Sequence, residues 1–203
     1  MSKLKIYGVA TNRTMRTIWL AKELGLDYEL IETTSRDGST KTPEFLALNP
    51  NASVPTIQDG ELVLWESLAI NLYLVDKHGG ELAPKDAAEG ALALQWSFWA
   101  AGNVELVALE ILFNRMLLPE DERDAAVADG AEAKLAKPLT VLDGALADRD
   151  YLLGSRFTVA DLNVAAIMSW VKLGSVDLSA HDNVTAWLGR CLSRPAFVEA
   201  RGG

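Results

Sequence analysis

Residue types that build disulfides and metal centres are nearly absent from the chain. Cys191 is the single cysteine, which excludes a disulfide within the chain and a cysteine-based zinc site. The two histidines, His78 and His181, stand in no pattern typical of a metal site or a catalytic triad. We therefore expect a protein without a metal, in a reducing and cytoplasmic environment.

The chain also lacks an excess of positive charge and a long uninterrupted apolar run. Its formal net charge of −9 argues against general binding to nucleic acid or to membrane surfaces, because both are polyanions. No apolar run reaches the length that crosses a bilayer, and residues 1–6 lead into an expected strand rather than a signal peptide. With 49% hydrophobic residues and six tryptophans, the chain can still bury a sizeable core.

The most informative segment is SVPTIQDGELVLWESLAI, residues 53–70. Asp59 and the glycine after it, between two apolar runs, predict a β-hairpin because a tight turn needs residues that tolerate positive φ. Pro55 has no N–H and predicts an edge strand or a bend. Glu66 and Ser67 then open a helix, where a hydroxyl and free backbone N–H groups favour an anion.

The first part of the chain predicts an α/β layer. Strand and helix signals alternate there, and glycine and proline mark where elements end or begin. We expect strands at 4–9 and 28–33, helices at 14–24, 43–48 and 67–77, and the hairpin before the last helix. This order resembles a thioredoxin fold.

The second part is rich in alanine and leucine and predicts helices only. They are expected at 87–118, 122–146, 158–172 and 183–192. We expect a bend in the first of these helices near Gly102, and Pro138 should kink or break the second. The expected organisation is a domain at 1–78, a linker at 79–86 that contains two glycines and a proline, and a helical domain at 87–203.

These motifs follow the order and spacing of one known family. Residues 6–29, 43–50 and 53–70 are similar to the N-terminal domain of cytosolic glutathione S-transferases, and GSRFTVAD at 154–161 matches the capping motif of their helical domain. The resemblance is to bacterial-type members of the Ser/Thr rather than the Cys type. It implies a thioredoxin-like domain followed by a helical bundle, with glutathione as co-substrate. Asp161, within the capping motif, is expected to be structural.

The resemblance assigns the glutathione-binding residues by position. Pro55 matches a proline that follows a cis peptide bond, and the main chain of Val54 is expected to pair with the cysteinyl part of glutathione. Glu66 is expected to bind the γ-glutamyl ammonium, and Ser67 the γ-glutamyl carboxylate. The alternatives are a trans proline that ends an edge strand, and an ordinary helix cap.

Two further contacts depart from the family pattern. The family often has glycine and then lysine or glutamine where this chain has Ala52 and Ser53, so a side-chain contact from Ser53 is shortened or lost. Lys41 could bind the glycyl carboxylate of glutathione instead, or it is an ordinary solvated lysine.

The family places Tyr, Ser or Cys after the first strand to stabilise the thiolate of glutathione. Counting back from Arg16, which matches a basic residue of the family, puts Thr11 at the usual serine position, and a slip of one residue puts Asn12 there. Either residue could donate a hydrogen bond to the sulfur, and either could simply cap the helix. Tyr7 lies within the expected strand and is assigned to the core.

The electrophile is expected to bind between the two halves, against the long helix. Candidate residues are Trp99, Asn103, Asn114 and Arg115, although aromatic residues at helical spacing are more often core. The leading hypothesis is a detoxifying glutathione transferase, with peroxidase, dehalogenase or isomerase activity as related possibilities. The alternatives are a non-catalytic scaffold module and a carrier of apolar ligands. The family also implies a homodimer, with no nucleic acid and no membrane as partner.

Overall fold

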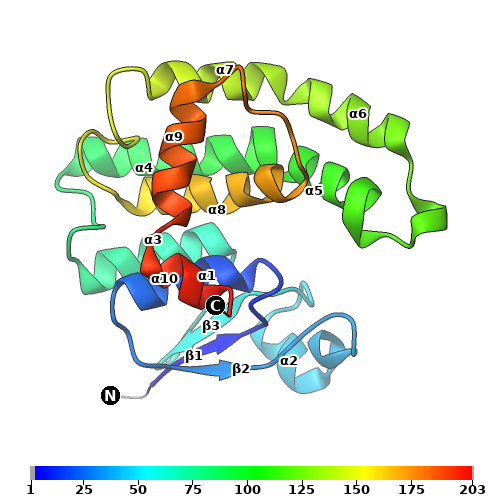
Figure 1. Ribbon diagram of the computed structural model, residues 1–203. Coiled ribbons are helices and arrows are strands. Elements are labelled where there is room, and N and C mark those ends of the chain that lie inside the picture. Colours follow the sequence, from blue (N-terminus) through cyan, green and yellow to red (C-terminus); the bar gives the residue numbers. More distant parts are fainter. Residues whose placement is uncertain (1–2, 203) are drawn as a thin grey trace. The chain divides into compact units, whose positions relative to one another are not determined.

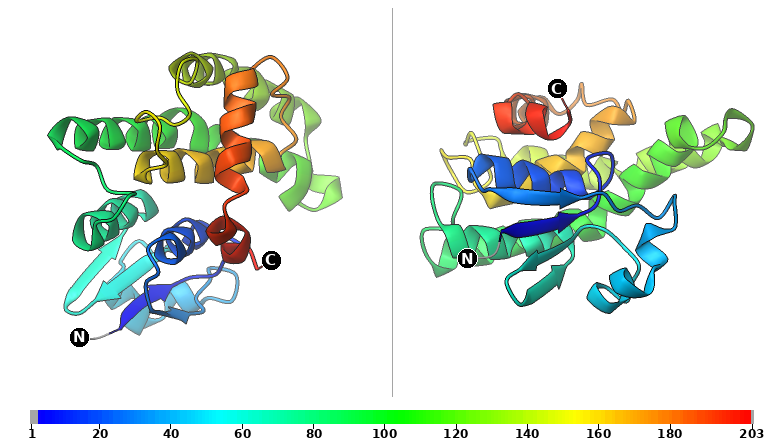
Figure 2. Two further views of the ribbon diagram at one scale, coloured as in Figure 1. Left: turned by 60° about the vertical axis from the view of Figure 1, so that its left-hand side comes forward. Right: turned by 90° about the horizontal axis from the view of Figure 1, so that it is seen from below.

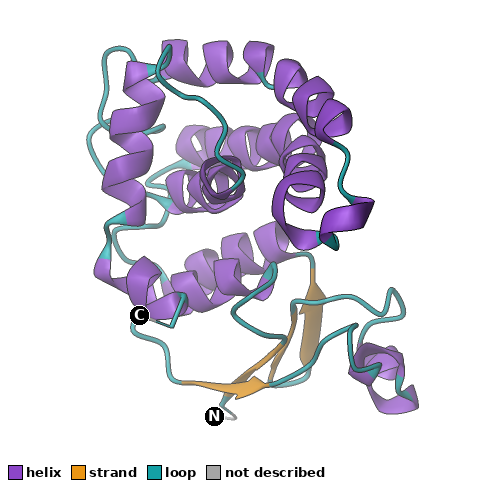
Figure 3. Cartoon of the chain, turned by 45° about the vertical axis from the view of Figure 1, so that its right-hand side comes forward, coloured by secondary structure: helices purple, strands orange, loops and turns teal. Residues whose placement is uncertain are grey.

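The computed structural model describes residues 3–202 and consists of two compact units. The first unit extends to Ala83 and includes the segment from Arg194 onward, and the second spans Pro84–Ser193. All strands belong to the first unit, whereas the second is built from helices (Figure 3). The sequence assigns residues 87–203 to one helical domain; in the structure the C-terminal segment packs with the first unit instead.

The first unit has the thioredoxin-like arrangement that the sequence predicts. Its strands follow the order β2-β1-β3-β4, with β1 parallel to β2 and the other neighbours antiparallel. Helices α1 and α3 lie side by side on one face of this sheet (Figure 1). The elements of the unit are β1 (Leu4–Tyr7), α1 (Thr14–Glu23), β2 (Tyr28–Ile31), the 3-10 helix η1 (Ser39–Lys41), α2 (Pro43–Leu48), β3 (Thr56–Asp59), β4 (Leu62–Trp65), α3 (Ser67–His78) and α10 (Pro195–Ala200).

Apolar residues from the sheet and from two helices form the core of the first unit. Ile6 on β1 pairs with Ile57 on β3, and both side chains are fully buried. Trp19 and Leu20 from α1 and Ile70 from α3 are fully buried as well. Each such side chain contributes roughly 1.5–3 kcal/mol when it leaves water, so this layer holds the two helices on the sheet.

The predicted hairpin forms between β3 and β4, where Gly60 has a φ of +65°. Its turn is tied to the C-terminal half of α3, because Asp59 Oδ2 accepts hydrogen bonds from the Tyr73 hydroxyl at 2.9 Å and from Lys77 Nζ at 2.5 Å. Burial raises the pKa of the Asp59 carboxyl, but the hydrogen bonds from Lys77 and Tyr73 outweigh burial and hold this pKa below its ordinary value.

Helix α10, which the sequence analysis does not predict, packs on α1 in the first unit (Figure 2). Arg194 donates two hydrogen bonds to the Glu23 carboxylate, at 2.6 and 2.7 Å. Trp19 Nε1 donates a third to the same carboxylate at 2.9 Å, and Phe197 meets the Trp19 ring edge-on with 4.8 Å between centroids. The end of the chain is thereby fixed to the C-terminal half of α1.

The second unit consists of helices around a buried central helix, α8. From Val159 to Ser169 every residue of α8 is buried. The elements of the unit are α4 (Ala87–Ala100), the π-helical turn η2 (Ala101–Glu105), α5 (Leu106–Leu112), the π-helical turn η3 (Phe113–Leu117), the 3-10 helix η4 (Glu120–Glu122), α6 (Ala125–Lys134), α7 (Ala136–Ala145), α8 (Val159–Leu173) and α9 (Asp182–Leu192).

Two irregularities that the sequence indicates appear in these helices. The first predicted helix is a continuous run, Ala87–Leu117, and Gly102 lies within its first π-helical turn. The helix predicted at 122–146 is two helices, α6 and α7, which meet at Leu135. Pro138 explains the break, because its ring excludes the carbonyl four residues earlier, on Lys134.

By length and composition alone, the run Ala87–Leu117 could cross a membrane, whereas the sequence analysis expected no such run. The two conclusions differ because a mean hydropathy over an 18-residue stretch of the helix can be high although Glu105 and Glu110 interrupt the apolar run. In the structure 44% of its most apolar stretch is buried, and α4 and α5 pack against α8. The core helix of a globular unit meets the same test.

The predicted capping box begins α8 and is more extensive than the sequence indicates. Asp161 is fully buried, and its Oδ2 accepts hydrogen bonds from both the N–H and the hydroxyl of Thr158, at 3.0 Å each. Its Oδ1 accepts hydrogen bonds from Leu152 N at 2.8 Å and from Trp187 Nε1 at 3.0 Å. Burial raises the pKa of Asp161, and these four hydrogen bonds oppose the increase. This side chain therefore joins three segments of the helical unit.

Candidate functional site

One edge of the sheet in the first unit collects most of the residues that the sequence singles out. Tyr7, the last residue of β1, pairs with Thr56, the first residue of β3, and Thr56 pairs with Trp65, the last residue of β4. The loop after β1, the turn before β3 and the start of α3 therefore lie together. We call this region the binding edge; it comprises residues 8–13, 53–55, 66 and 67.

At the binding edge the Val54–Pro55 peptide bond is cis, as the family resemblance implies. Val54 is half-buried, and within residues 3–202 its main-chain N–H and C=O form no hydrogen bond. An extended peptide can therefore pair with this residue in the way that one strand adds to another.

Asn49, which the sequence analysis does not single out, fixes the turn that carries Val54. Its buried amide nitrogen donates hydrogen bonds to the Ser53 carbonyl oxygen at 2.8 Å and to Thr56 Oγ1 at 3.0 Å. The sequence signal is an asparagine directly before Pro50, since asparagine side chains commonly organise such turns.

Ala52 has a φ of +51°, in the left-handed region that glycine adopts most easily. Glycine, which the family resemblance implies at this position, suits this conformation, and alanine there carries local strain. Ser53 follows with an exposed side chain; its Oγ accepts a long hydrogen bond from Asn49 Nδ2 at 3.4 Å.

Glu66 and Ser67 form the start of α3 at the binding edge. Glu66 has a φ of +75° and a ψ of 107°, a conformation that L side chains rarely adopt, and its side chain is exposed. Such strained residues occur preferentially at ligand sites. Ser67 is the first residue of the helix and is buried, so its hydroxyl stands beside the N-terminal N–H groups of α3.

Arg16 supports Ser67 from the neighbouring helix. It is only 1% exposed, and its Nη1 donates a hydrogen bond to Ser67 Oγ at 3.3 Å. The main-chain oxygen of Arg16 accepts a hydrogen bond from Asn71 Nδ2 at 3.4 Å. From the sequence alone, Arg16 serves only as a marker for counting; its signal as a site residue is a positive charge in the stretch TMRTIWLA, which holds no other charged side chain.

The loop after β1 gives Thr11 and Asn12 different environments. The Asn12 side-chain oxygen accepts a hydrogen bond at 2.9 Å from Thr14 N, the first N–H of α1, so this residue satisfies one of the free donors at the start of the helix. Thr11 is exposed, and its hydroxyl forms no hydrogen bond within the described part of the chain. Gly8 begins the loop with a φ of +143°, and a Cβ there would lie 1.8 Å from Thr14 Oγ1, so only glycine fits.

Lys41 and Tyr7 are two further residues of the first unit that the sequence analysis considers. Lys41 is exposed at the end of η1 and forms no ion pair among the described residues. Tyr7 is half-buried, as a core residue near the edge would be; its hydroxyl donates to Gln58 Oε1 at 3.3 Å, and its ring lies edge-on to Phe45.

The electrophile candidates lie in the second unit. Trp99 is half-buried against Trp96, with 5.1 Å between ring centroids, and the exposed Asn103 donates a hydrogen bond to the Trp99 carbonyl oxygen at 2.9 Å. Both residues belong to the run that includes α4 and the π-helical turn η2, and π-helical turns are frequent at functional sites.

Asn114 and Arg115 have partners inside the helical unit. Asn114 Oδ1 accepts a hydrogen bond from the N–H of Asp124 at 3.2 Å. The Arg115 guanidinium pairs with Glu132 at 2.5 Å and donates to the Gly174 carbonyl oxygen at 2.9 Å. Both side chains thus connect helices of this unit.

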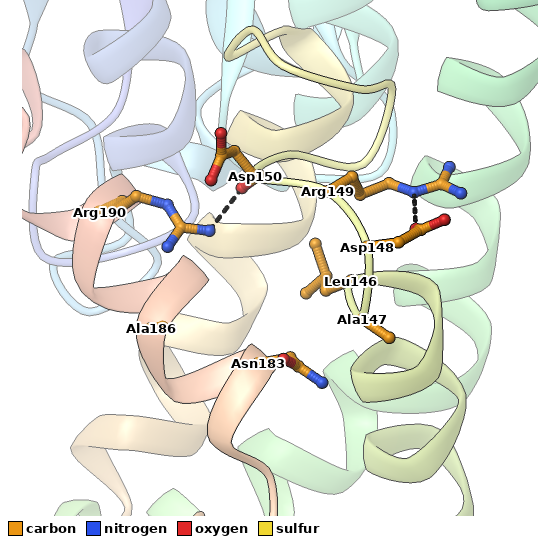
Figure 4. A pocket seen from close by; sticks show the side chains of 8 residues that line it. All are labelled: Leu146, Ala147, Asp148, Arg149, Asp150, Asn183, Ala186 and Arg190. Atoms are coloured by element: carbon orange, nitrogen blue, oxygen red, sulfur yellow. Dashed lines mark hydrogen bonds and ion pairs between the residues drawn. The ribbon is translucent and has the colours of Figure 1, made fainter.

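The helical unit also carries an open, mostly polar pocket of about 300 Å³, shown in Figure 4. Arg149 pairs there with Asp148, and Arg190 donates to the Asp150 carbonyl oxygen. None of the site residues predicted from the sequence lines it. The lining residues are Leu146, Ala147, Asp148, Arg149, Asp150, Asn183, Ala186 and Arg190. Between residues 3 and 202, no cluster of His, Cys, Asp or Glu is suited to a metal ion.

Comparisons with known proteins agree with this architecture. Residues 2–76 match the glutathione S-transferase N-terminal domain, and residues 105–195 match the C-terminal domain. The chain is 34% identical to glutathione S-transferase 3 of Zea mays, over 97% of this chain and 92% of the relative. It is 35% identical to a glutathione S-transferase of Hyoscyamus muticus, over 97% of each.

Solved structures show the same similarity. A theta class glutathione S-transferase from Xanthomonas axonopodis pv. citri superposes with a TM-score of 0.90 at 34% identity, over 100% of this chain and 99% of that one. A glutathione transferase F7 from Populus trichocarpa gives a TM-score of 0.89 at 27% identity, over 98% of each chain. With both domains and the whole length matched, this chain belongs to the glutathione S-transferase family.

Proposed function

We propose that this chain is a glutathione transferase, which binds glutathione at the binding edge and stabilises its thiolate for attack on an electrophilic small molecule. The observation that carries the proposal is that the Val54 main chain, the start of α3 and the loop with Thr11 share one edge of the sheet. Relatives support the ligand: the Xanthomonas structure has glutathione bound, and a maize glutathione S-transferase I holds an atrazine glutathione conjugate.

The chemistry of the binding edge, together with Lys41 at the end of η1, complements glutathione from end to end. Val54 pairs through its N–H and C=O with the cysteinyl main chain. Ser67 and the N–H groups of α3 bind the γ-glutamyl carboxylate, and Glu66 binds the γ-glutamyl ammonium. At the other end Lys41 binds the glycyl carboxylate, and Ser53 offers a short polar contact. These roles match one charged or polar group of the chain to each group of the tripeptide.

Between the two candidates for thiol activation we favour Thr11. The Asn12 side chain is held at the start of α1, because its oxygen accepts the hydrogen bond from Thr14 N, whereas the Thr11 hydroxyl is exposed, has no partner in the described residues and can turn toward a ligand. A free thiol has a pKa of about 8.5 and is mostly protonated at neutral pH. A hydrogen bond from Thr11, beside the N-terminus of α1, favours the thiolate and lowers that pKa.

The thiolate sulfur then forms a bond to an electrophilic carbon, from which a leaving group departs with its electron pair. The enzyme supplies the reactive thiolate and the orientation of the acceptor. We propose Trp99 and Asn103 as acceptor contacts. Asn114 and Arg115 are weaker candidates, because their side chains already connect helices of the second unit.

The second candidate function is a glutathione-binding module without catalysis. It is favoured by one observation, the threonine at the position where the family has Ser, Tyr or Cys. A homodimer in the cytoplasm is the expected state under either function, since both are usual for the family.

The test combines calorimetry of glutathione binding with the ultraviolet absorbance of its thiolate as pH is varied. A transferase binds glutathione in the micromolar-to-millimolar range, Ser67→Ala weakens binding, and the bound thiol has a lowered pKa. Thr11→Val should abolish that lowering and Thr11→Ser should preserve it, while Asn12→Ala should leave it in place; loss of the lowering in Asn12→Ala would assign the activation to Asn12 instead. Tight binding with an ordinary thiol pKa would indicate the non-catalytic module, and no binding at millimolar glutathione would reject both functions.

A further inference from the structure

A buried polar pair joins two helices of the second unit within its apolar core. Asn163 on α8 is fully buried, and Ser97 on α4 is 2% exposed. Asn163 Nδ2 donates a hydrogen bond to Ser97 Oγ at 2.9 Å, and Ser97 Oγ donates in turn to the Ala93 carbonyl oxygen at 2.8 Å. A chain of hydrogen bonds therefore runs from the side chain of α8 to the main chain of α4.

The side chains that share this side of α4 with Ser97 are small. Ala93 and Ala100, four residues before Ser97 and three after it, are fully buried, and α4 packs against α8 (Figure 1). Apolar contacts of such small groups have no preferred direction, so they oppose sliding or rotation of the helix only weakly. A hydrogen bond weakens steeply when its angle changes. The Ser97–Asn163 bond therefore fixes both the position of α4 along α8 and its rotation.

We propose that Ser97 and Asn163 are positioning residues that determine acceptor specificity, because they orient Trp99; this inference rests on the proposed function. Trp99 comes two residues after Ser97, so it projects about 200° around the helix from it, on nearly the opposite side of α4. Asn103 stands beside Trp99 and donates a hydrogen bond to its carbonyl oxygen at 2.9 Å. A slip of α4 by one residue would turn Trp99 by about 100° and move it by about 1.5 Å along the axis. The bond to Asn163 opposes that movement.

Stability alone does not require a polar pair at this place. Replacing both partners of a buried hydrogen bond by apolar groups of similar shape is often nearly neutral. Buried polar groups select one arrangement of helices in some proteins, at no gain in stability. The π-helical turn η2 begins at Ala101, four residues after Ser97, so the pair holds α4 directly before the helix changes its pitch. The segment that carries Trp99 lies between these two features.

A purely structural role for the pair makes a different prediction. If the pair only stabilises the helical unit, its loss changes the affinity for all ligands by a common factor or not at all. If it orients Trp99, its loss weakens ligands that carry an acceptor group and spares glutathione itself. Selectivity between two ligands therefore separates the two roles, whatever happens to stability.

The experiment measures dissociation constants for glutathione and for S-(2,4-dinitrophenyl)glutathione, which adds a flat aromatic acceptor group. Ser97→Ala is expected to weaken binding of the conjugate about fivefold or more, as for a lost aromatic contact, and binding of glutathione less than about twofold. Ser97→Thr keeps the hydroxyl and should hold both constants within about twofold of wild type. Ser169→Ala is the matched control, since it removes another buried hydroxyl of this core, one that donates to the Ala166 carbonyl oxygen of its own helix. It should change neither constant by more than about twofold.

Double variants test whether the effect passes through the pair and through Trp99. Ser97→Ala combined with Asn163→Leu should weaken the conjugate no more than the stronger single variant, because both changes remove the same hydrogen bond. In the Trp99→Ala background, Ser97→Ala should cost less than about twofold in affinity for the conjugate. An equal loss in both backgrounds, or an equal loss for both ligands, would overturn the inference.

The wild-type protein itself separates this inference from the proposed function. Wild type that binds glutathione but gains no affinity from the dinitrophenyl group would overturn the inference alone, since Trp99 would then contact no acceptor. Wild type that binds neither ligand would instead reject the proposed function. If Ser97→Ala does not fold, Asn163→Leu removes the same hydrogen bond from the other helix and should show the same loss of selectivity; unchanged selectivity in that variant would overturn the inference.

Discussion

Replacing Asp161 with asparagine is expected to lower the free energy of unfolding by about 2–4 kcal/mol. The wild-type carboxylate accepts four hydrogen bonds and is fully buried. Asparagine keeps one oxygen, which still serves Leu152 N and Trp187 Nε1, but its NH2 group replaces the oxygen that faces Thr158. The Thr158 hydroxyl can rotate to accept from this group.

The Thr158 N–H cannot rotate, so two donors face each other in a buried site. A hydrogen bond to a charged acceptor contributes about 1.5–3 kcal/mol, and a buried unsatisfied donor costs about 1–3 kcal/mol more. Removal of the buried negative charge offsets part of this loss. The sum exceeds the ~1 kcal/mol that a single helix cap provides, because Asp161 also holds two other segments.

Urea unfolding followed by circular dichroism measures this effect as a lower midpoint at an unchanged slope. Asp182→Asn is the matched control, the same exchange at the exposed first residue of α9, and it should cost no more than about 0.5 kcal/mol. If Asp161→Asn unfolds within that same margin of wild type, the four hydrogen bonds do not stabilise the helical unit as argued.

Three further substitutions test other parts of the first unit. Ala52→Gly should stabilise the protein by about 0.5–1 kcal/mol in thermal unfolding, because relief of left-handed strain exceeds the added freedom of the unfolded chain; a lower melting temperature would contradict this. Glu23→Gln should cost about 2 kcal/mol and speed hydrogen exchange in α10, since Arg194 loses its charged partner; unchanged exchange would show that the ion pair does not hold α10. The lowered pKa of Asp59 contributes stability that is present above pH ~4 and is lost as pH falls through the folded pKa. Wild type should therefore unfold at a higher free energy than Asp59→Asn near neutral pH and lose this difference in acid. A difference in the free energy of unfolding that does not change with pH would refute the role of Lys77 as the partner of Asp59.

Elements fixed by neighbouring residues could be predicted from the sequence. Helix α2 has the expected bounds, Pro43–Leu48, because proline suits the first turn and the Thr42 side chain accepts a hydrogen bond from Phe45 N. The hairpin also forms where Asp59 and its glycine predict it. Pro138 also indicates a break in the helix predicted at 122–146. The break lies at Leu135, before the proline, because the proline ring excludes a hydrogen bond to the carbonyl four residues earlier.

Contacts between distant residues could not be predicted in this way. Arg194 meets Glu23 across 171 positions, and no local pattern around either residue indicates the pairing. For the site, the motifs name Thr11 and Asn12 equally well. Our proposal of Thr11 rests on the hydrogen bond from Thr14 N to the Asn12 side chain, which is a property of the folded loop.

Helix α1 connects these distant contacts to the proposed chemistry. The loop with Thr11 precedes it, Arg16 in its first turn reaches Ser67, and Glu23 at its last position is bound by Arg194. A helix fixed at both ends cannot slide along the sheet without breaking one of these contacts, so the Thr11 loop and Ser67 keep their relative places. The segment after the helical unit therefore contributes to the binding edge, although it contains none of the residues proposed to touch glutathione.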